Sequence, residues 1–344
     1  MEILIVKLGA LGDVLRTTSI LRPLRARYPG ARFEWITAKP AVPLLEGNPL
    51  VGRVVAIEDA VFGDFSARFD LVLSLEEDAA AAALAQSACR GELVGIIVKD
   101  GKLGYTASSA GYYDLSLLNA DKDGGHKKAD ELKVRNRLSY AQLWLKALGL
   151  PDSAGDDLRP ILALTDADRQ TALALSQKYR FSAGEPIGLN PGAGKRWPAK
   201  QLSEMKAARL LGGLAAFKRP LLLLGGADEG ARNSAIAAQA GNAAVIDVGT
   251  GHGLREFAGI IELCGLVIST DSLAFHVATA LGVKALALVG PTSAAELDAF
   301  GRGGALTPKG GCACFYRPRC QFEASCLEGM PDEAVISAAR NLLS

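Results

Sequence analysis

The sequence lacks long apolar runs, a strong excess of charge of either sign, and any large number of histidines or cysteines. Its 344 residues carry a formal net charge of +1, with three histidines and six cysteines. No uninterrupted apolar stretch reaches the roughly 20 residues that a membrane-spanning helix needs. The balanced charge excludes the generally basic class of nucleic-acid binder, so local patches must meet any anionic partner.

The N-terminal stretch, MEILIVKLGALGDVL, has no basic leader and no obvious cleavage site. Glu2, Lys7 and Asp13 lie inside its apolar pattern, which favours a first strand over a signal peptide. We therefore expect a cytoplasmic protein whose contact with the inner membrane, if made, is peripheral. In that compartment the cysteines should be reduced thiols or metal ligands, and disulfides are not expected.

Two common nucleotide-binding motifs are also missing. The first glycine turn has the spacing Gly9-x-x-Gly12 and not G-x-G-x-x-G. The strand expected at 32–36 is followed by Thr-Ala-Lys-Pro, without the acidic residue that would hold a ribose. No G-x-x-x-x-G-K-[ST] loop appears. These absences weaken the interpretation as a dehydrogenase and remove the common ATPase class.

What the chain does contain is two alternating series of strands and helices. Residues 149–160, with three acidic residues and two prolines, have the composition of a linker between them. The pattern predicts an α/β protein with two Rossmann-like domains facing across a cleft. We assign 1–160 to the first domain and 161–330 to the second. The last helix, 331–344, is expected to stabilise the fold and to pack back on the first domain.

The first expected strand, 2–7, leads into a glycine turn and a helix over 14–27. Gly12 permits close approach of a ligand to the backbone, and Asp13 falls at the start of the helix. The helix dipole favours a carboxylate at this position, so Asp13 can accept a proton in a cleft. Residues 99–137, rich in tyrosine and cations, form a long loop and a helix start. They suit an acidic acceptor and equally a solvated basic surface.

The second series opens with a strand at 186–189 and the turn NPGAGKRWP at 190–198. Flexible backbone and adjacent cations there can converge on a diphosphate. The candidate binding residues of this turn are Asn190, Gly192, Gly194, Lys195 and Arg196. The next strand, 221–224, ends before Asp228 and Glu229, whose carboxylates suit ribose or sugar hydroxyls, although Asp228 could instead cap the following helix.

Residues 266–293 predict two neighbouring parallel strands with polar ends. Thr270, Asp271 and Ser272 follow the first of them, and Gly290, Pro291 and Thr292 follow the second. Ligands of open α/β sheets bind at such strand ends and at exposed helix N-termini. The simpler interpretation is that Asp271 and Ser272 only cap the next helix. His276 lies in that mostly apolar helix, where a packed and hydrogen-bonded histidine is the default.

Taken together, these motifs resemble glycosyltransferase family 9, which includes the ADP-heptose:lipopolysaccharide heptosyltransferases. The resemblance rests on LGALGD at 8–13, NPGAGKRWP, GGADE at 225–229, STDSLAFHVATALG at 269–282 and VGPTS at 289–293, in collinear order. It implies a GT-B fold in which the first domain binds the acceptor and the second the nucleotide sugar. It also implies that Asp13 is the general base and that Lys195 contacts the donor diphosphate.

By the same resemblance, Asp228 is an acidic donor contact, and Asp271, Ser272 and His276 belong to the donor loop. The chain departs from the family where an Asp-Ser/Thr-Gly turn is common, because Leu273 replaces the glycine. Backbone approach is less free there. This departure bears on the identity of the donor more than on the chemistry.

The function implied is an inverting glycosyltransferase that moves a heptose from ADP-heptose to a lipopolysaccharide-core or related anionic glycolipid. No cofactor or metal is required for this reaction, and no nucleic acid is a partner. Two alternatives stay open, namely a family member that uses another nucleotide sugar and a non-catalytic nucleotide-sugar or glycan-binding protein. A nucleotide-dependent oxidoreductase is a distant further alternative.

Four cysteines, Cys312, Cys314, Cys320 and Cys326, gather near the C-terminus. Four thiols can hold a structural zinc ion or an iron–sulfur cluster. The spacing lacks the paired Cys-x-x-Cys knuckles typical of zinc sites. We therefore favour a reduced cysteine-rich loop over a structural metal.

Overall fold

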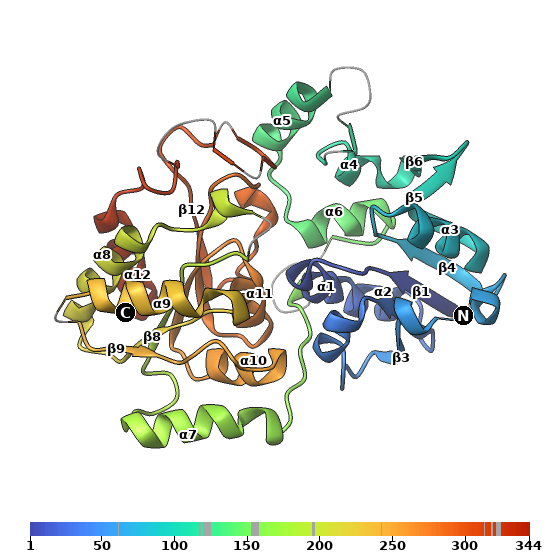
Figure 1. Cartoon of the computed structure of the whole chain (residues 1–344). Helices are drawn as coiled ribbons and strands as arrows, with labels where there is room; N and C mark the ends of the chain where they lie inside the picture. The colour runs from blue at the N-terminus through green and yellow to red at the C-terminus, as the bar shows by residue number, and fades with distance from the viewer. Residues whose placement is uncertain are drawn as a thin grey trace. The chain divides into compact units, whose positions relative to one another are not determined.

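The computed structural model divides the chain into two compact units, Met1–Ala163 and Leu164–Ser344. Each unit contains its own sheet, flanked by helices (Figure 1). The structure describes residues 1–60, 62–116, 118–119, 125–152, 158–194, 197–241, 243–312, 314–317, 319–320 and 325–344. Lys195 and Arg196 lie outside these residues.

The first unit is built on six described strands in the order β3-β2-β1-β4-β5-β6. The five strands β1 to β5 pair in parallel, and β6 pairs antiparallel with β5. The described strands and α-helices of this unit are β1 (Glu2–Val6), α1 (Leu11–Thr17), α2 (Leu21–Arg27), β2 (Arg32–Thr37), β3 (Val51–Ala56), β4 (Phe69–Ser74), α3 (Ala79–Ala88), β5 (Cys89–Lys99), β6 (Lys102–Tyr105), α4 (Ala110–Tyr113), α5 (Gly125–Arg135) and α6 (Tyr140–Ala147).

The central strand of the first unit is covered on both faces. Ile3, Leu4, Ile5 and Val6 of β1 are all fully buried, as the near-continuous apolar run of a parallel strand requires. Polar side chains start two of the surrounding helices. Asp78 accepts the backbone N–H of Ala81 at the start of α3, and Ser139 forms a capping box with Gln142 at the start of α6.

The second unit repeats the plan with strand order β12-β11-β10-β7-β8-β9, and all of these pairs are parallel. The carboxyl ends of its strands therefore share one edge of the sheet. Its described strands and α-helices are α7 (Gln170–Tyr179), β7 (Ile187–Asn190), α8 (Glu204–Leu214), β8 (Leu221–Leu223), α9 (Gly230–Gln239), β9 (Val245–Asp247), α10 (Leu254–Glu262), β10 (Leu266–Thr270), α11 (Leu273–Ala280), β11 (Lys284–Leu288), β12 (Gly303–Leu306) and α12 (Asp332–Leu343).

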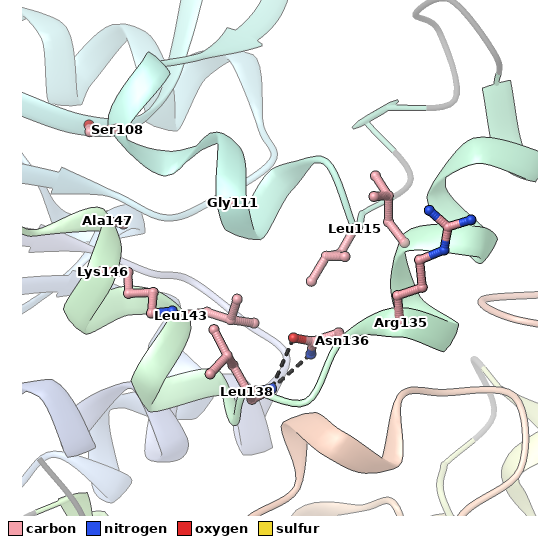
Figure 2. Close-up of a pocket in the computed structure, with 10 residues that line it drawn as sticks. Ser108, Gly111, Leu115, Arg135, Asn136, Leu138, Leu143, Lys146 and Ala147 are labelled. Atoms are coloured by element: carbon pink, nitrogen blue, oxygen red, sulfur yellow. Dashed lines mark hydrogen bonds between the residues drawn. The ribbon is translucent and has the colours of Figure 1, made fainter. Parts of the chain in front are cut away.

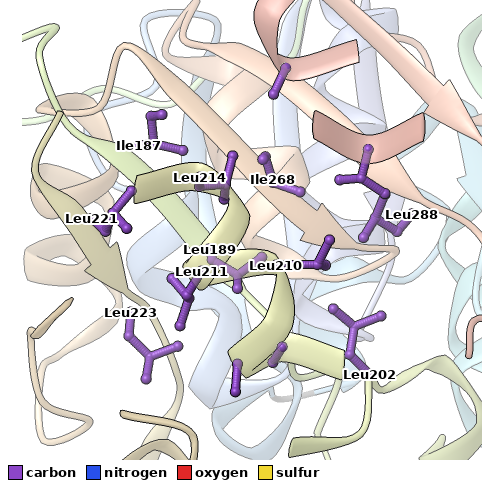
Figure 3. Packing of buried hydrophobic residues seen from close by; sticks show 14 of the residues in the cluster. Ile187, Leu189, Leu202, Leu210, Leu211, Leu214, Leu221, Leu223, Ile268 and Leu288 are labelled. Atoms are coloured by element: carbon purple, nitrogen blue, oxygen red, sulfur yellow. The ribbon is translucent and has the colours of Figure 1, made fainter. Parts of the chain in front are cut away.

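A leucine-rich core fills the space between this second sheet and helices that include α8. Figure 3 shows Leu210, Leu211 and Leu214 of α8 packed over Leu189 and Ile268 of the sheet. Each of these side chains is fully buried. Burial of one such leucine contributes about 1.5–3 kcal/mol to stability, so this cluster is a major stabilising element of the unit.

The terminal helix α12 corrects an expectation. We predicted that it packs on the first domain, but Val335 and Ala339 are buried in the core of the second unit, against α8. Its amphipathic pattern shows that one face must be covered, and does not show which core covers it.

The two parallel sheets confirm an α/β fold with two Rossmann-like domains. The cleft between them stays a prediction. Within the described residues, no helix is both long and apolar enough to cross a membrane.

Candidate functional site

The strand ends of β7 and β10 are tied together by hydrogen bonds. The buried Asn190 side chain donates from Nδ2 to the Gly192 carbonyl and to Ser272 Oγ, both at 3.0 Å. Thr270 Oγ1 donates to the same Gly192 carbonyl at 2.7 Å. These bonds hold the turn after β7 against the start of α11, at the edge where parallel sheets bind ligands.

Ser272 occupies the N-cap of α11, but its side chain does not cap the helix within the described residues. Its hydroxyl instead lies 2.8 Å from Ser269 Oγ and accepts from Asn190. Ser272 is therefore more than a helix cap, because its side chain bonds to the turn after β7. The eight-residue helix α11 directs its first backbone N–H groups toward this edge, which suits an anionic ligand.

Asp271 lies between two basic side chains. Lys200 Nζ donates to Asp271 Oδ2 at 2.7 Å, and His276 Nε2 lies 3.9 Å from Asp271 Oδ1. The three side chains are 8–17% exposed. Low exposure strengthens the ion pair and fixes the direction of the carboxylate. His276 also packs edge-on against Phe275, so it is a mostly buried histidine that faces a site residue.

Glu229 lies directly over the turn after β7. A Cβ atom placed on Gly192 would come within 1.6 Å of Glu229 Oε1, so only glycine fits at this position. Glu229 is 9% exposed and accepts the backbone N–H of Gly226 at 2.8 Å. Asp228 is exposed and lies within the 3₁₀ helix η11 (Ala227–Glu229), while the N-cap of α9 is Glu229. Asp228 is therefore not the N-cap residue of α9.

Gly194 and the turn after β11 complete the edge. Gly194 has φ of +69° with open space around it, a conformation that favours glycine. Gly290, Pro291 and Thr292 are buried, and the Pro291 carbonyl accepts the backbone N–H of Tyr316 at 2.8 Å. The structure thus gathers the described candidate residues of the second unit at one edge of its sheet.

In the first unit, Asp13 lies in the first turn of α1, as predicted from the glycine turn. Arg16 Nη2 is 2.9 Å from Asp13 Oδ1, and the Asp13 side chain is 36% exposed. The Arg16 guanidinium stacks 4.0 Å from the centre of the Tyr140 ring. Tyr140 in turn bonds Thr17 at 2.6 Å, so α6 supports the cation that orients Asp13.

A second carboxylate organises the turn before Asp13. Glu76 Oε2 accepts the backbone N–H groups of Leu8 and Gly9 at 2.9 and 3.1 Å, and it pairs with Lys7 at 3.1 Å. The partly buried backbone donors of the glycine turn are thus satisfied by a side chain that follows β4.

Sequence reasoning did not single out Lys200, Arg16 or Glu76. Lys200 and Glu76 contact residues about 70 positions away in the chain. Arg16 contacts Asp13 within one helix, and nothing in the local sequence marks that pair. For Lys200 the available signal was its position just after the cationic turn that contains Lys195.

The four C-terminal cysteines form two sulfur pairs. Cys314 and Cys320 have their sulfur atoms 3.8 Å apart, and the Cys312 thiol is hydrogen-bonded to Cys326. That bond lowers the pKa of Cys326, the acceptor, and raises the pKa of Cys312. The described residues contain no group of three or more His, Cys, Asp or Glu side chains placed to hold a metal ion.

The sequence model of glycosyltransferase family 9 (heptosyltransferase) matches residues 65–312, more than half of the chain. The chain belongs to glycosyltransferase family 9. Membership of this family makes it a glycosyltransferase, and confirms the resemblance inferred from the motifs.

Individual proteins of the family are similar to this chain in sequence and in structure. Lipooligosaccharide heptosyltransferase 2 of Haemophilus influenzae is 25% identical over 308 residues, which cover 85% of this chain and 84% of that protein. A family 9 glycosyltransferase structure from Veillonella parvula has a TM-score of 0.74 at 18% identity and covers 99% of this chain and 97% of its own. The ADP-heptose LPS heptosyltransferase II of E. coli has a TM-score of 0.65 at 19% identity, covering 100% and 98%. These structures share the fold.

Proposed function

We propose that this glycosyltransferase moves a heptose, with inversion, from ADP-heptose to a lipopolysaccharide-core or related anionic glycolipid. The acceptor lies in a membrane, so the protein would meet it at the cytoplasmic face of the inner membrane. The observation that carries the proposal is the gathering of Asn190, Thr270, Asp271 and Ser272 at the ligand-binding edge of the second sheet in a chain of this family.

In the proposed reaction, Asp13 takes the proton from an acceptor hydroxyl as that oxygen attacks the anomeric carbon. The new bond forms on the face opposite the leaving group, and the bond from the anomeric carbon to the diphosphate oxygen breaks. ADP leaves with the electron pair. The helix N-terminus at Ser272 stabilises this charge, and so would Lys195 and Arg196. Asp271, Asp228 and Glu229 would bind sugar and ribose hydroxyls.

The identity of the nucleotide-sugar donor needs a direct test, because Leu273 stands where the family commonly has glycine. The first experiment is a calorimetric titration with ADP, UDP, GDP and NAD under matched conditions. Selective ADP binding that weakens in Asp271→Ala and Lys195→Ala supports the proposal. A preference for UDP or GDP would keep the chemistry and overturn the heptose donor. Binding of NAD alone would contradict the assigned donor class.

Transfer itself tests Asp13. Asp13→Ala should bind ADP as the wild type does and lose transfer by roughly 10²–10⁴-fold, the contribution of a general base. Asp64→Ala, which removes an exposed carboxylate of the same unit, is the matched control. Unchanged transfer by Asp13→Ala would remove Asp13 from the mechanism. A wild-type protein that binds ADP but transfers no sugar would favour a non-catalytic binding protein.

We also propose that the reaction needs no cofactor and that the C-terminal thiols are reduced. Elemental analysis of protein purified without a histidine tag tests the second statement. Stoichiometric zinc or iron in the preparation would contradict it and favour a structural metal site.

A further inference from the structure

A pocket of about 320 Å³ opens in the first unit between α4, the end of α5, and α6 (Figure 2). Asp13 is not among its lining residues. Figure 2 shows Leu115 pointing across the pocket toward Leu138 and Leu143. Its lining residues are Ser108, Gly111, Leu115, Leu132, Arg135, Asn136, Leu138, Leu143, Lys146 and Ala147. This volume is at the lower end of the range for ligand pockets, so it suits part of a large amphiphile.

The floor of the pocket is apolar and its rim is cationic. Four leucines form the floor, while Arg135 and Lys146 are exposed, and none of the lining residues that the structure describes is acidic. Within the described part of the chain, neither cation has an ion-pair partner. Apolar surface that stays open to water costs about 25 cal/mol for each Å², so an apolar group gains by entering. The two cations would meet an anion beside it.

The walls are held in place by packing and hydrogen bonds. Asn136 both donates to the Leu138 carbonyl at 2.9 Å and accepts from its N–H at 3.0 Å, which fixes the turn between α5 and α6. Trp144 of α6 is fully buried and contacts Tyr112 and Tyr113 of α4. A pocket that is already formed binds its ligand without a further ordering cost.

An exposed apolar side chain lies beside the same rim. Val134, next to Arg135 on α5, is 60% exposed, and Lys127 and Lys128 are exposed on that helix. A valine among cations is typical of a surface that contacts anionic lipid.

From these features we infer that the pocket is a docking site for an anionic lipid, with one acyl chain over the leucines and a phosphate on Arg135 and Lys146. Its occupant is the glycolipid acceptor of the proposed reaction, and to that extent the inference rests on the proposed function. The inference adds a binding position for the lipid part of the acceptor, which does not react.

The test is a calorimetric titration of the whole protein with dodecyl phosphate below its micelle concentration. Inorganic phosphate and dodecyl maltoside separate the contributions of charge and chain. We expect dodecyl phosphate to bind at least about tenfold more tightly than either. Equal binding of dodecyl maltoside would overturn the role of the cations, and equal binding of phosphate would overturn that of the leucines.

Gly111→Leu fills the pocket without disturbing its walls. A Cβ on Gly111 meets nothing within 4 Å, and leucine is the better helix former. Gly212 of α8 has the same open surroundings in the second unit, so Gly212→Leu is the matched control. We expect dodecyl phosphate affinity to fall at least about tenfold in Gly111→Leu and to stay within about twofold of wild type in Gly212→Leu. Wild-type affinity in Gly111→Leu would overturn the site.

Charge is tested by the double variant Arg135→Gln/Lys146→Gln, with Arg27→Gln/Lys102→Gln as a control of equal net charge. Only the first pair should weaken binding to vesicles of phosphatidylglycerol, and equal weakening by both would show a general charge effect and overturn the site. ADP titration of the same samples separates the two proposals. Failure to bind ADP counts against the proposed function, whereas failure to bind dodecyl phosphate counts against this pocket.

Discussion

At the scale of single residues, a cation holds a candidate carboxylate in place in each of the two units. Lys200 fixes Asp271, and Arg16 fixes Asp13, each through a contact below 3 Å. Opposite charges in a partly desolvated setting restrict the rotamers of both partners. The carboxylates are therefore oriented before any ligand arrives, and binding does not have to order them.

Cys326 gives a prediction at the same scale. Because its sulfur accepts the Cys312 thiol proton, the pKa of Cys326 is lowered and its thiolate persists to lower pH than that of an ordinary cysteine. With limiting iodoacetamide at neutral pH, we expect Cys326 to be alkylated before Cys312, as peptide mass spectrometry would show. Cys89, whose pKa is raised by burial, is the internal control. Earlier alkylation of Cys312 or Cys89 would reverse the assignment.

At the scale of elements, α12 is fastened to α8 by a buried ion pair. Lys206 is 1% exposed and bonds both Asp332 and the Met330 carbonyl, and Arg209 bonds Asp332 at 2.8 Å. Burial alone would raise the pKa of Asp332, but the bonds from Lys206 and Arg209 outweigh it and hold that pKa below its usual value. The carboxylate at the start of α12 is thus the partner of a fully buried ammonium.

We predict that Asp332→Ala lowers the free energy of unfolding by about 3 kcal/mol, because it leaves the Lys206 charge buried without its carboxylate. Lys206→Met/Asp332→Ala should recover most of this loss, since no unpaired charge then remains. Glu333→Ala, an exposed acid in the same turn, should have little effect. Urea unfolding of the four proteins measures all of these differences. A double variant no more stable than Asp332→Ala would contradict the explanation.

A second ion pair joins the 3₁₀ helix η8 (Ala167–Arg169) to α10. Arg255 donates to both Asp168 oxygens, at 2.9 and 2.7 Å, and this is the main reason that the pKa of Asp168 lies well below its usual range. A depressed carboxylate pKa adds stability above the unfolded-state pKa of about 3.9, and that stability is lost as the pH falls through the folded-state pKa.

We therefore predict that Asp168→Asn lowers the free energy of unfolding by about 1–2 kcal/mol at pH 7. The difference from wild type should shrink below about pH 4, where the wild-type carboxylate begins to lose its advantage. Asp166→Asn, which changes a fully exposed acid, is the control. Denaturant unfolding between pH 3 and 7 gives the result, and a difference that is constant with pH would rule out this origin.

The elements also show what the sequence can specify. Buried strands such as β1 and β10 were predicted within one or two residues, because parallel strands have a continuous apolar run and end at glycine or polar turns. The hairpin of β6 with β5 and most of α5 were missed inside a predicted loop. Both are short or polar, so tertiary packing decides their structure more than local pattern does.

The same limit applies to the candidate site. Asp13 and the turn after β10 were predicted from their place between a strand and a helix. The contact of Lys200 with Asp271 joins residues 71 positions apart, and the pocket needs three helices at once. Neither leaves a periodic signal in the sequence. The face that covers α12 was predicted wrongly for the same reason.

At the scale of the whole molecule, each unit has its own sheet and its own buried core. We predict that a fragment of residues 164–344 folds alone, because the contacts of its core, including those of α12, lie within it. Circular dichroism and thermal melting should show helix and strand content and one cooperative transition. A fragment without a cooperative transition would mean that the second unit needs the first to fold.

The order of the strands also matters while the chain is being made. The last strand of the first sheet in chain order is β6, so all strands of this sheet leave the ribosome early in synthesis. In the second sheet, β7 emerges long before its neighbour β10, and α12 comes last. Until β10 emerges, β7 has an unpaired edge, and until α12 emerges part of the leucine core stays uncovered. Chaperones bind such exposed edges and apolar surfaces. The first unit can thus mature on the ribosome, whereas the second completes its fold only after α12 has been released.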